Sequence, residues 1–280
     1  MTDPQNNADD ATVQGFGDEW SRFDQTGLSD AERQEIWEQY FGLLDFAALG
    51  PNIRALDVGC GSGRWAQLVA PKVKELLCID ASEDAAAVAR RNLAGHRNCS
   101  VQVASVGALP VPDNSFDLVY SLGVLHHVPD TRAAIAECAR KVRPGGSLLV
   151  YLYYRFDNRP PWYAAVWRAS ELGRRTISRM PHGLRYASSQ VIAASVYLPL
   201  ARAARLAESL GRPVAQWPLS YYRDRSFYVM RTDALDRFGT RLEQRFTRKE
   251  IREMLESAGL GNVRFSDRAP FWCALAQKPA

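Results

Sequence analysis

A mainly apolar run that ends in three closely spaced glycines constrains this sequence more than any other feature. Residues 53–58 predict a buried strand, and glycines follow at positions 59, 61 and 63. Glycine at alternate positions lets the backbone adopt positive φ and approach a ligand with no Cβ in between. A helix is predicted over 64–70, so the free amides of its first turn would face that ligand. The stretch therefore predicts a strand–turn–helix site for a nucleotide-like ligand with one anionic group.

The spacing of the glycines narrows the kind of ligand. A dinucleotide fingerprint places its third glycine three residues after the second, whereas Gly61 and Gly63 are two apart and Asp57 precedes the first glycine by two. Asp80 ends the next predicted strand, where an acid can accept hydrogen bonds from both hydroxyls of a ribose. The alternatives are a glycine turn that binds nothing and a surface acid in a loop.

Strands and helices alternate after residue 53, which predicts a parallel sheet with helices on both faces. The five strands expected in this part are 53–58, 75–79, 100–104, 116–121 and 147–153, and the helices are 64–70, 82–93 and 130–141. A capping box at 247–250 begins a helix that runs to about residue 257. Two final strands are expected at 262–265 and 271–276.

The segments on either side of this core differ from it in composition. Residues 1–14 lack apolar side chains and are expected to be a disordered tail. Residues 15–50 predict a helical cap, because Phe16, Trp20 and Phe23 have near-helical spacing and a capping box stands at 29–32.

Residues 155–231 break the alternation. They contain thirteen arginines, no lysine and four acids, a local net charge of +9, so the rest of the chain carries −5. Two helical patterns, 162–179 and 188–210, are visible, and Pro199 is expected to kink the second. The segment predicts an arginine-rich helical lid over an acceptor pocket, after which 232–280 completes the sheet. A solvated basic face over an aromatic core is the alternative.

Composition excludes several classes of protein. A net charge of +4 over 280 residues is too small by itself to indicate a nucleic-acid partner, and no DNA partner is expected. The five cysteines are scattered with no C-x-x-C pair, which argues against a zinc site and for free thiols in a reducing compartment. The acidic N-terminus is unlike a signal peptide, and no apolar run approaches the ~20 residues that span a bilayer. We therefore expect a cytoplasmic protein.

Four motifs then identify a family. The string Asp-Val-Gly-Cys-Gly-Ser-Gly at 57–63 resembles motif I of the class I S-adenosylmethionine-dependent methyltransferases. The segment 108–117 resembles the "LPF…FD" stretch before their fourth strand, 121–128 resembles the motif after it that ends here in Leu-His-His-Val, and 143–146 resembles the turn before strand five. The resemblance covers 51–154 and, more loosely, 245–278, and is to the small-molecule type with the "LPF…LHHV" pattern.

This resemblance implies a fold and a cofactor. The fold is a doubly wound, Rossmann-like α/β domain whose seven-stranded mixed sheet has the order 3-2-1-4-5-7-6, with strand 7 antiparallel and the helical insertion after strand 5. The cofactor is S-adenosylmethionine, with no metal. The residues implied to bind it are Asp57, Gly59, Cys60, Gly61, Gly63, Asp80, Ala81, Ser105, Val106 and Ser121. Ser105 departs from the family's usual aspartate, which predicts weaker adenine recognition.

Methyl transfer from a sulfonium is a direct displacement, so the enzyme mainly aligns the reacting groups. A general base is needed only for a protonated acceptor. His126 and His127, just past the fourth strand, are the candidates, although one or both could simply pack in the loop. Tyr153, Tyr154 and Arg155 end the fifth strand and are expected to bind substrate in the same cleft, or else to pack against the lid.

The substrate hypothesis comes from the arginines. They predict a small-molecule or lipid-linked acceptor with an anionic group, or contact of the chain with an anionic membrane surface. An RNA methyltransferase and a non-catalytic cofactor-binding scaffold are the alternatives. The sequence indicates neither the acceptor atom nor the oligomeric state.

Overall fold

The computed structural model describes residues 2–3, 7–25, 27–50 and 52–280. Residues 1 and 4–6 of the predicted tail, and Pro51 at the start of the predicted core, lie outside these. The chain divides into two compact units. Unit 1 comprises 1–25, 34–155 and 242–280, and unit 2 comprises 26–33 and 156–241.

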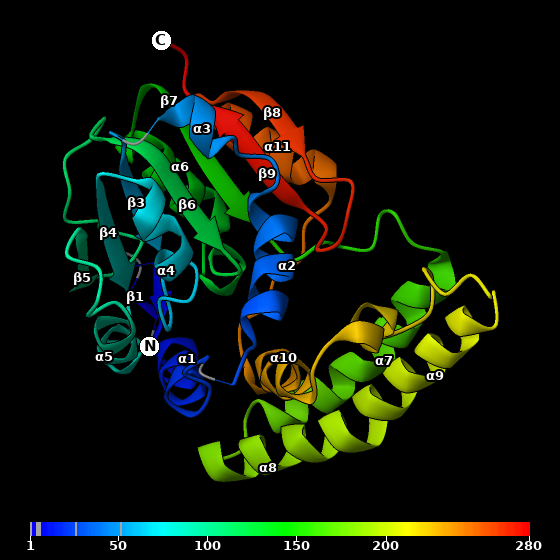
Figure 1. The fold of residues 1–280 in the computed structure, drawn as a ribbon. Coiled ribbons are helices and arrows are strands. Elements are labelled where there is room, and N and C mark those ends of the chain that lie inside the picture. Colours follow the sequence, from blue (N-terminus) through cyan, green and yellow to red (C-terminus); the bar gives the residue numbers. More distant parts are fainter. Residues whose placement is uncertain (1, 4–6, 26, 51) are drawn as a thin grey trace. The chain divides into compact units, whose positions relative to one another are not determined.

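The centre of unit 1 is a seven-stranded sheet, in which five parallel strands are followed by an antiparallel pairing at one edge (Figure 1). Its strands are β3 (Arg54–Val58), β4 (Glu75–Asp80), β5 (Cys99–Val103), β6 (Phe116–Leu122), β7 (Val142–Tyr151), β8 (Gly261–Phe265) and β9 (Cys273–Gln277). They are ordered β5-β4-β3-β6-β7-β9-β8, and β9 is antiparallel to both neighbours. Numbered along the chain within this sheet, the order is 3-2-1-4-5-7-6, which confirms the predicted topology. A separate two-stranded sheet pairs β1 (Thr2–Asp3) with β2 (Ala8–Asp9).

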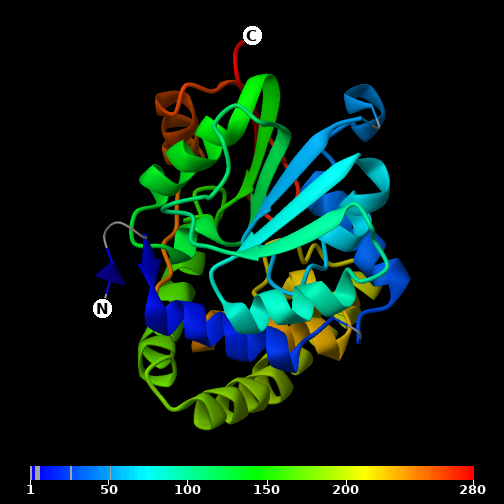
Figure 2. The same cartoon turned by 90° about the vertical axis from the view of Figure 1, so that its left-hand side faces the viewer.

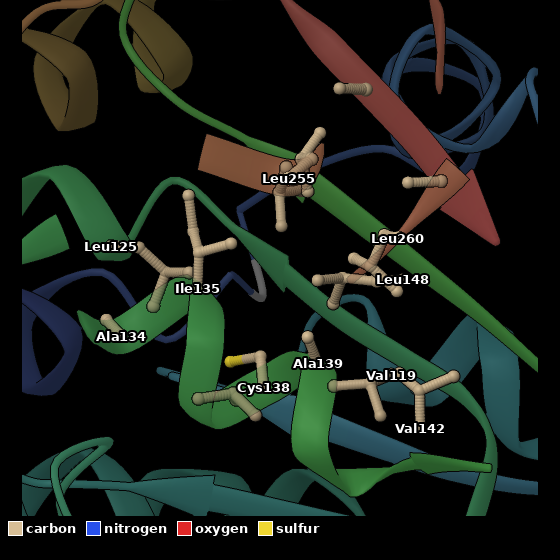
Figure 3. Close-up of a cluster of buried hydrophobic side chains, with 14 of the residues drawn as sticks. Val119, Leu125, Ala134, Ile135, Cys138, Ala139, Val142, Leu148, Leu255 and Leu260 are labelled. Atoms are coloured by element: carbon tan, nitrogen blue, oxygen red, sulfur yellow. The ribbon is translucent and has the colours of Figure 1, made fainter. Parts of the chain in front are cut away.

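One face of the sheet is covered by α6 (Thr131–Lys141) and α11 (Arg248–Ser257). Figure 3 shows how Ile135 and Cys138 of α6 meet Val119 and Leu148 of the strands, with Leu255 of α11 beside them. All of these side chains are fully buried. Asp130 caps α6 and the predicted capping box of Thr247 and Glu250 begins α11, so local sequence places both helices correctly.

The other face carries α2 (Asp30–Phe41), α3 (Phe46–Leu49), α4 (Ala66–Val69) and α5 (Glu83–Asn92). Phe41 packs edge-on against Tyr120 of β6, with ring centroids 5.5 Å apart. The helix predicted over 64–70 is shorter than expected, because residues 61–65 form turns and Pro71 lies in a 3₁₀ turn, η1 (Ala70–Lys72). A four-residue helix carries little macrodipole, so the predicted role of its N-terminus as an anion site is not supported.

The N-terminal helix α1 (Asp10–Arg22) lies along α5 (Figure 2). It begins earlier than the sequence predicted, since residues 10–14 were expected in the disordered tail. The reason is a local cap: the Asp9 side chain accepts from the amide and hydroxyl of Thr12. The two helices approach closely, because a Cβ on Gly17 would stand 2.6 Å from Ser82 Oγ.

Unit 2 is helical, with α7 (Pro161–Ile177), α8 (His182–Ile192), a π turn η3 (Ala193–Tyr197), α9 (Leu198–Ser209), a 3₁₀ turn η4 (Ser220–Asp224) and α10 (Phe227–Gly239). Its core joins Ala193, Tyr197 and Ala201 to Met230 and Ala234 of α10. The unit therefore extends to residue 241, ten residues beyond the predicted insertion, because the apolar side of α10 completes its core. Pro199 lies in the first turn of α9, directly after the π turn, and the kink expected there stays a prediction.

Candidate functional site

The carboxyl ends of β3, β4, β6 and β7 lie at one edge of the sheet, since these strands are parallel. The glycine loop follows β3 there, and Gly59, Gly61 and Gly63 all have the predicted positive φ, at 79°, 54° and 77°. The amides of Gly59 and Cys60 both donate to the Ile79 carbonyl, at 2.7 and 3.0 Å. The end of β4 thus holds the loop in place.

Asp80, the last residue of β4, is tied to the same loop. Its two carboxylate oxygens accept from the amides of Gly61 and Ser82, at 2.8 and 2.9 Å. Burial raises the pKa of Asp80. A carboxylate can accept about four hydrogen bonds, so both oxygens keep capacity for a ligand hydroxyl. Ala81, which follows, is exposed.

Asp57 on β3 has no such support. The residue is only 3% exposed, and Oδ2 has no hydrogen-bond partner among the described residues. It pairs in the sheet with Tyr120 of β6, whose buried hydroxyl favours the Asp57 carboxylate but meets the geometry of a full hydrogen bond with no described residue. Burial raises the pKa of Asp57 to about 8. A neighbouring cation would offset this penalty by favouring the carboxylate.

More buried polar atoms at this edge lack partners in the described part of the chain. They are Ser62 Oγ in the glycine loop and both ring nitrogens of His126, just after β6. Buried polar groups are nearly always hydrogen-bonded, so a cluster of exceptions around one loop indicates a site whose ligand supplies the missing bonds. A ligand with a positive charge and several donors and acceptors fits this set.

The remaining predicted cofactor residues have varied surroundings. Ser121 is fully buried and donates from Oγ to the Val58 carbonyl at 2.7 Å, which ties the ends of β6 and β3 together. Ser105 Oγ accepts from the Gly107 amide at 3.4 Å, and Val106 beside it is buried. Cys60 is buried within the loop. Their roles toward a cofactor stay predictions.

The two histidines lie in a 3₁₀ turn, η2 (Leu125–His127), and differ in environment. His126 is fully buried, and burial holds its pKa well below the ordinary 6.5. His127 Nδ1 lies 2.7 Å from the Leu242 carbonyl, which can only accept, so Nδ1 carries the proton there. In the neutral ring the lone pair is then on Nε2, which suits a general base.

The three residues predicted to bind substrate make contacts in different parts of unit 1. Tyr153 stacks on His126 with ring centroids 3.8 Å apart. Tyr154 instead packs against Phe271, and Arg155 pairs with Glu250 at 2.9 Å, so both also serve the C-terminal part of unit 1. Only Tyr153 is therefore brought against the histidines.

Sequence reasoning missed the contribution of α1. A Cβ on Gly61 would stand 2.8 Å from the Trp20 ring, and the Phe16 ring lies 4.9 Å from that of His127. The helical spacing of both aromatics is visible in the sequence, but nothing local indicates that Trp20 faces a loop about forty residues on, or Phe16 a histidine more than a hundred residues on. Tyr120 was missed because an apolar strand hides its hydroxyl.

The described residues hold neither a group of three or more metal-binding side chains nor a helix long and apolar enough to cross a membrane. The five cysteines are free thiols, and all but the half-buried Cys99 are buried.

Comparison with known proteins decides the family. Residues 56–150 match the model of the methyltransferase domain. An uncharacterised methyltransferase of Mycobacterium tuberculosis is 31% identical over 147 residues, which cover 51% of this chain and 73% of that protein. The chain belongs to the methyltransferase family. The segment that matches the family model runs from β3 to β7 and contains the glycine loop, Asp80 and both histidines.

Other similar proteins are also named as methyltransferases. A ubiquinone biosynthesis O-methyltransferase of Sinorhizobium fredii is 36% identical over 35% of this chain and 40% of its own length. A protein of Mycobacterium tuberculosis named a probable S-adenosylmethionine-dependent methyltransferase is 34% identical over 44% of each chain. The chain spans about two fifths of the first curated relatives. A Bordetella parapertussis structure shares the fold, with TM-score 0.51 at 19% identity over 90% of this chain and 69% of that one.

Proposed function

We propose that this chain is an S-adenosylmethionine-dependent methyltransferase of the small-molecule, "LPF…LHHV" type. It transfers the methyl group by direct displacement to a small-molecule or lipid-linked acceptor that carries an anionic group. The observation that carries the proposal is the buried Asp57 carboxyl, whose Oδ2 has no hydrogen-bond partner among the described residues, beside the glycine loop and Asp80. The names of the relatives agree with this cofactor.

When bound, S-adenosylmethionine supplies a methyl group activated on a positively charged sulfur. Asp57 would hold the cationic, methionyl part, because its carboxylate is stable in this buried position only with a positive charge nearby. Asp80, fixed by two loop amides, would accept from the ribose hydroxyls. Asp57 releases its proton when that charge arrives, so binding and ionisation are coupled.

His127 would remove a proton from a hydroxyl or similar acceptor. The Leu242 carbonyl fixes the proton on Nδ1 and leaves Nε2 as the basic atom. His126 is the less suitable base, because burial holds its pKa low and so disfavours the imidazolium that proton transfer would form. Its ring instead packs against both His127 and Tyr153, with centroids 4.0 and 3.8 Å away, and would set the position of both.

The arginines of unit 2 support an anionic acceptor. Residues 156–241 hold fourteen arginines against six acids, and guanidinium groups bind carboxylates and phosphates with two parallel hydrogen bonds. Unit 2 follows β7 directly in the chain, so the segment that leaves the carboxyl edge of the sheet leads into it. The predicted lid over the acceptor pocket is part of this proposal.

Two measurements test the proposal. Calorimetry of the purified chain with S-adenosylmethionine should give a saturable Kd. Incubation with the methyl-labelled cofactor and separated host fractions should place label in the small-molecule or lipid fraction. Label in RNA would support the RNA alternative, and cofactor binding with label in no fraction would support the scaffold. Absence of cofactor binding would refute all three.

Replacing His127 tests the base. We expect His127→Gln to lower kcat by about 10²–10⁴-fold with little change in cofactor Kd, because only proton transfer is lost. His126→Gln should act differently, through packing, and shift thermal stability as well. Equal kcat for His127→Gln and the parent at every pH would remove the general base from the mechanism.

A further inference from the structure

Unit 2 exposes most of the large apolar side chains found on the surface. Twelve such residues are exposed in the described chain, and all but Val103 of β5 belong to unit 2. Scattered apolar residues need no explanation, whereas a cluster in one unit indicates an interaction surface. The largest group follows a single helical rod, α8–η3–α9.

The exposed residues on this rod share a face. We name it the α8–α9 face and define it by Leu184, Val191, Val196, Leu200, Leu206 and Leu210. Leu206 is 63% and Leu210 72% exposed. The opposite side of the rod is buried, with Ser189, Ala193, Tyr197, Ala201 and Ala204 turned inward at intervals of three or four residues. Helical geometry therefore assigns one side to the core of unit 2 and leaves the other in water.

The π turn keeps this division intact along the rod. Inward residues from 185 to 201 recur every four positions, which would drift around an ordinary α-helix of 3.6 residues per turn. The wider turn at 193–197 absorbs that drift. The exposed face consequently runs on from α8 into α9.

Charge indicates the partner. Between residues 182 and 212 the only acid is Glu208, and it is paired with Arg223 at 2.6 Å. Arg202, Arg205 and Arg212 are exposed on the same stretch. On α7, a second exposed apolar stripe at Trp162, Val166 and Leu172 is flanked by exposed Arg168, Arg175 and Arg179.

From these observations we infer that unit 2 docks on an anionic lipid surface through the α8–α9 face. An apolar helical face with flanking arginines buries its side chains at the boundary of the acyl region while the guanidinium groups meet acidic headgroups. A second copy of this chain fits less well, because two strongly basic units repel each other. The inference rests on unit 2 alone and holds whether or not the methyl transfer proposed above is correct.

Flotation with lipid vesicles tests it. The full-length chain should float with phosphatidylcholine vesicles that contain phosphatidylglycerol, and not with phosphatidylcholine alone. Raising NaCl from about 0.05 M to about 0.5 M should weaken the binding, since headgroup attraction is screened. No flotation with anionic vesicles at low salt would overturn the inference.

Two variants distinguish binding through the α8–α9 face from non-specific adsorption of the protein to vesicles. Val191→Ser/Leu206→Ser/Leu210→Ser should lower the partition coefficient by about tenfold or more, because three exposed apolar groups are lost. Val103→Ser, the exposed apolar residue of unit 1, is the matched control and should bind as the parent does. Equal vesicle binding by the triple variant and the parent would refute docking through this face. A stable dimer of the parent, or its retention on RNA, would also refute lipid docking if the triple variant abolishes it.

A labelling experiment covers the possibility that the triple variant misfolds. Ala203→Cys adds one exposed thiol on this side of α9, whereas the native cysteines are buried or half-buried. A polarity-sensitive dye there should shift its emission to the blue on anionic vesicles. The same dye at Glu253→Cys on α11 of unit 1 should not shift. An unchanged spectrum at position 203 would overturn the inference.

Discussion

The two units differ in where unpartnered polar atoms gather and in how many large apolar side chains they expose. Among the described residues, unit 1 gathers such polar atoms around one loop, at Asp57 Oδ2, Tyr120 and His126, and exposes one large apolar side chain, Val103. The described part of unit 2 exposes eleven large apolar residues. Its buried Arg174 and Arg185 donate to backbone carbonyls, and its own unpartnered buried atoms, such as Arg33 Nε and Asn158 Oδ1, do not surround one loop. Buried polar atoms that lack hydrogen bonds in unit 1 indicate a small ligand. Exposed apolar side chains on unit 2 instead indicate contact with an extended surface. The features that indicate a binding partner therefore lie inside unit 1, whereas those of unit 2 lie on its surface.

The strongest test of this contrast is the charge on Asp57. Asp57→Asn should weaken S-adenosylmethionine binding by about 100-fold or more, since a desolvated ion pair with the ligand is lost. For the parent chain, affinity should rise with pH up to about 8 and then level off, because the carboxyl must ionise first. Calorimetry in buffers of different ionisation enthalpy would detect the released proton. Unchanged affinity in Asp57→Asn would show that the ligand has been misidentified.

The same substitution should stabilise the ligand-free protein. Folding raises the pKa of Asp57 from its ordinary 3.8 to about 8, so the folded state binds the extra proton between these values. The free energy of unfolding should therefore fall as pH rises from about 4 to 8, by an amount on the order of a few kcal/mol. Asp57→Asn cannot ionise and should remove this slope in thermal melts. Asp267→Asn, at an exposed acid, is the control that should keep it.

Close packing of α1 on the glycine loop predicts a smaller effect. Gly61→Ala should destabilise unit 1 by about 1–3 kcal/mol, because φ is 54° and the new Cβ would meet the Trp20 ring. Gly95→Ala, where no atom lies within 4 Å of the new Cβ, should change stability by less than about 0.5 kcal/mol. Adding Trp20→Ala should recover the part of the loss that comes from the clash. Denaturant unfolding measures all three, and no recovery would mean that backbone strain alone is responsible.

In unit 2 the pH dependence should have the opposite sign. Burial raises the pKa of Glu171, but hydrogen bonds and charge from Arg174 and Arg237 outweigh it and lower the pKa to about 2. The stability that this carboxylate adds is present above its ordinary pKa of 4.5 and is lost as pH falls toward 2. Glu171→Gln should cost about 1–2 kcal/mol at neutral pH. Hydrogen exchange in α7 and α10 should report the change, with Glu208→Gln as the exposed control. Equal protection in both variants would contradict it.

The sequence predicted the features that depend on neighbouring residues or on a family motif. The strand order, the positive φ of the glycines, the Asp130 cap and the Thr247 capping box all follow from residues close in sequence or from a motif. Contacts between residues far apart in the sequence could not be predicted. Trp20 against Gly61, Tyr120 beside Asp57 and the Leu242 carbonyl on His127 join residues tens to more than a hundred positions apart. For the same reason the predicted insertion stops at residue 231, although the core of unit 2 includes α10 and the unit extends to residue 241.

The division of the chain also bears on how it is made. Unit 2 takes its first piece, residues 26–33, from before the sheet, and there the Glu32 carboxylate accepts from the Ser226 amide 194 residues later. Unit 1 likewise waits for β8 and β9 at the end of the chain. During synthesis, which proceeds from the N-terminus, neither unit can close before most of the polypeptide has left the ribosome. The nascent chain must therefore keep both unfinished cores from aggregating until α10 has completed the core of unit 2 and β9 the sheet of unit 1.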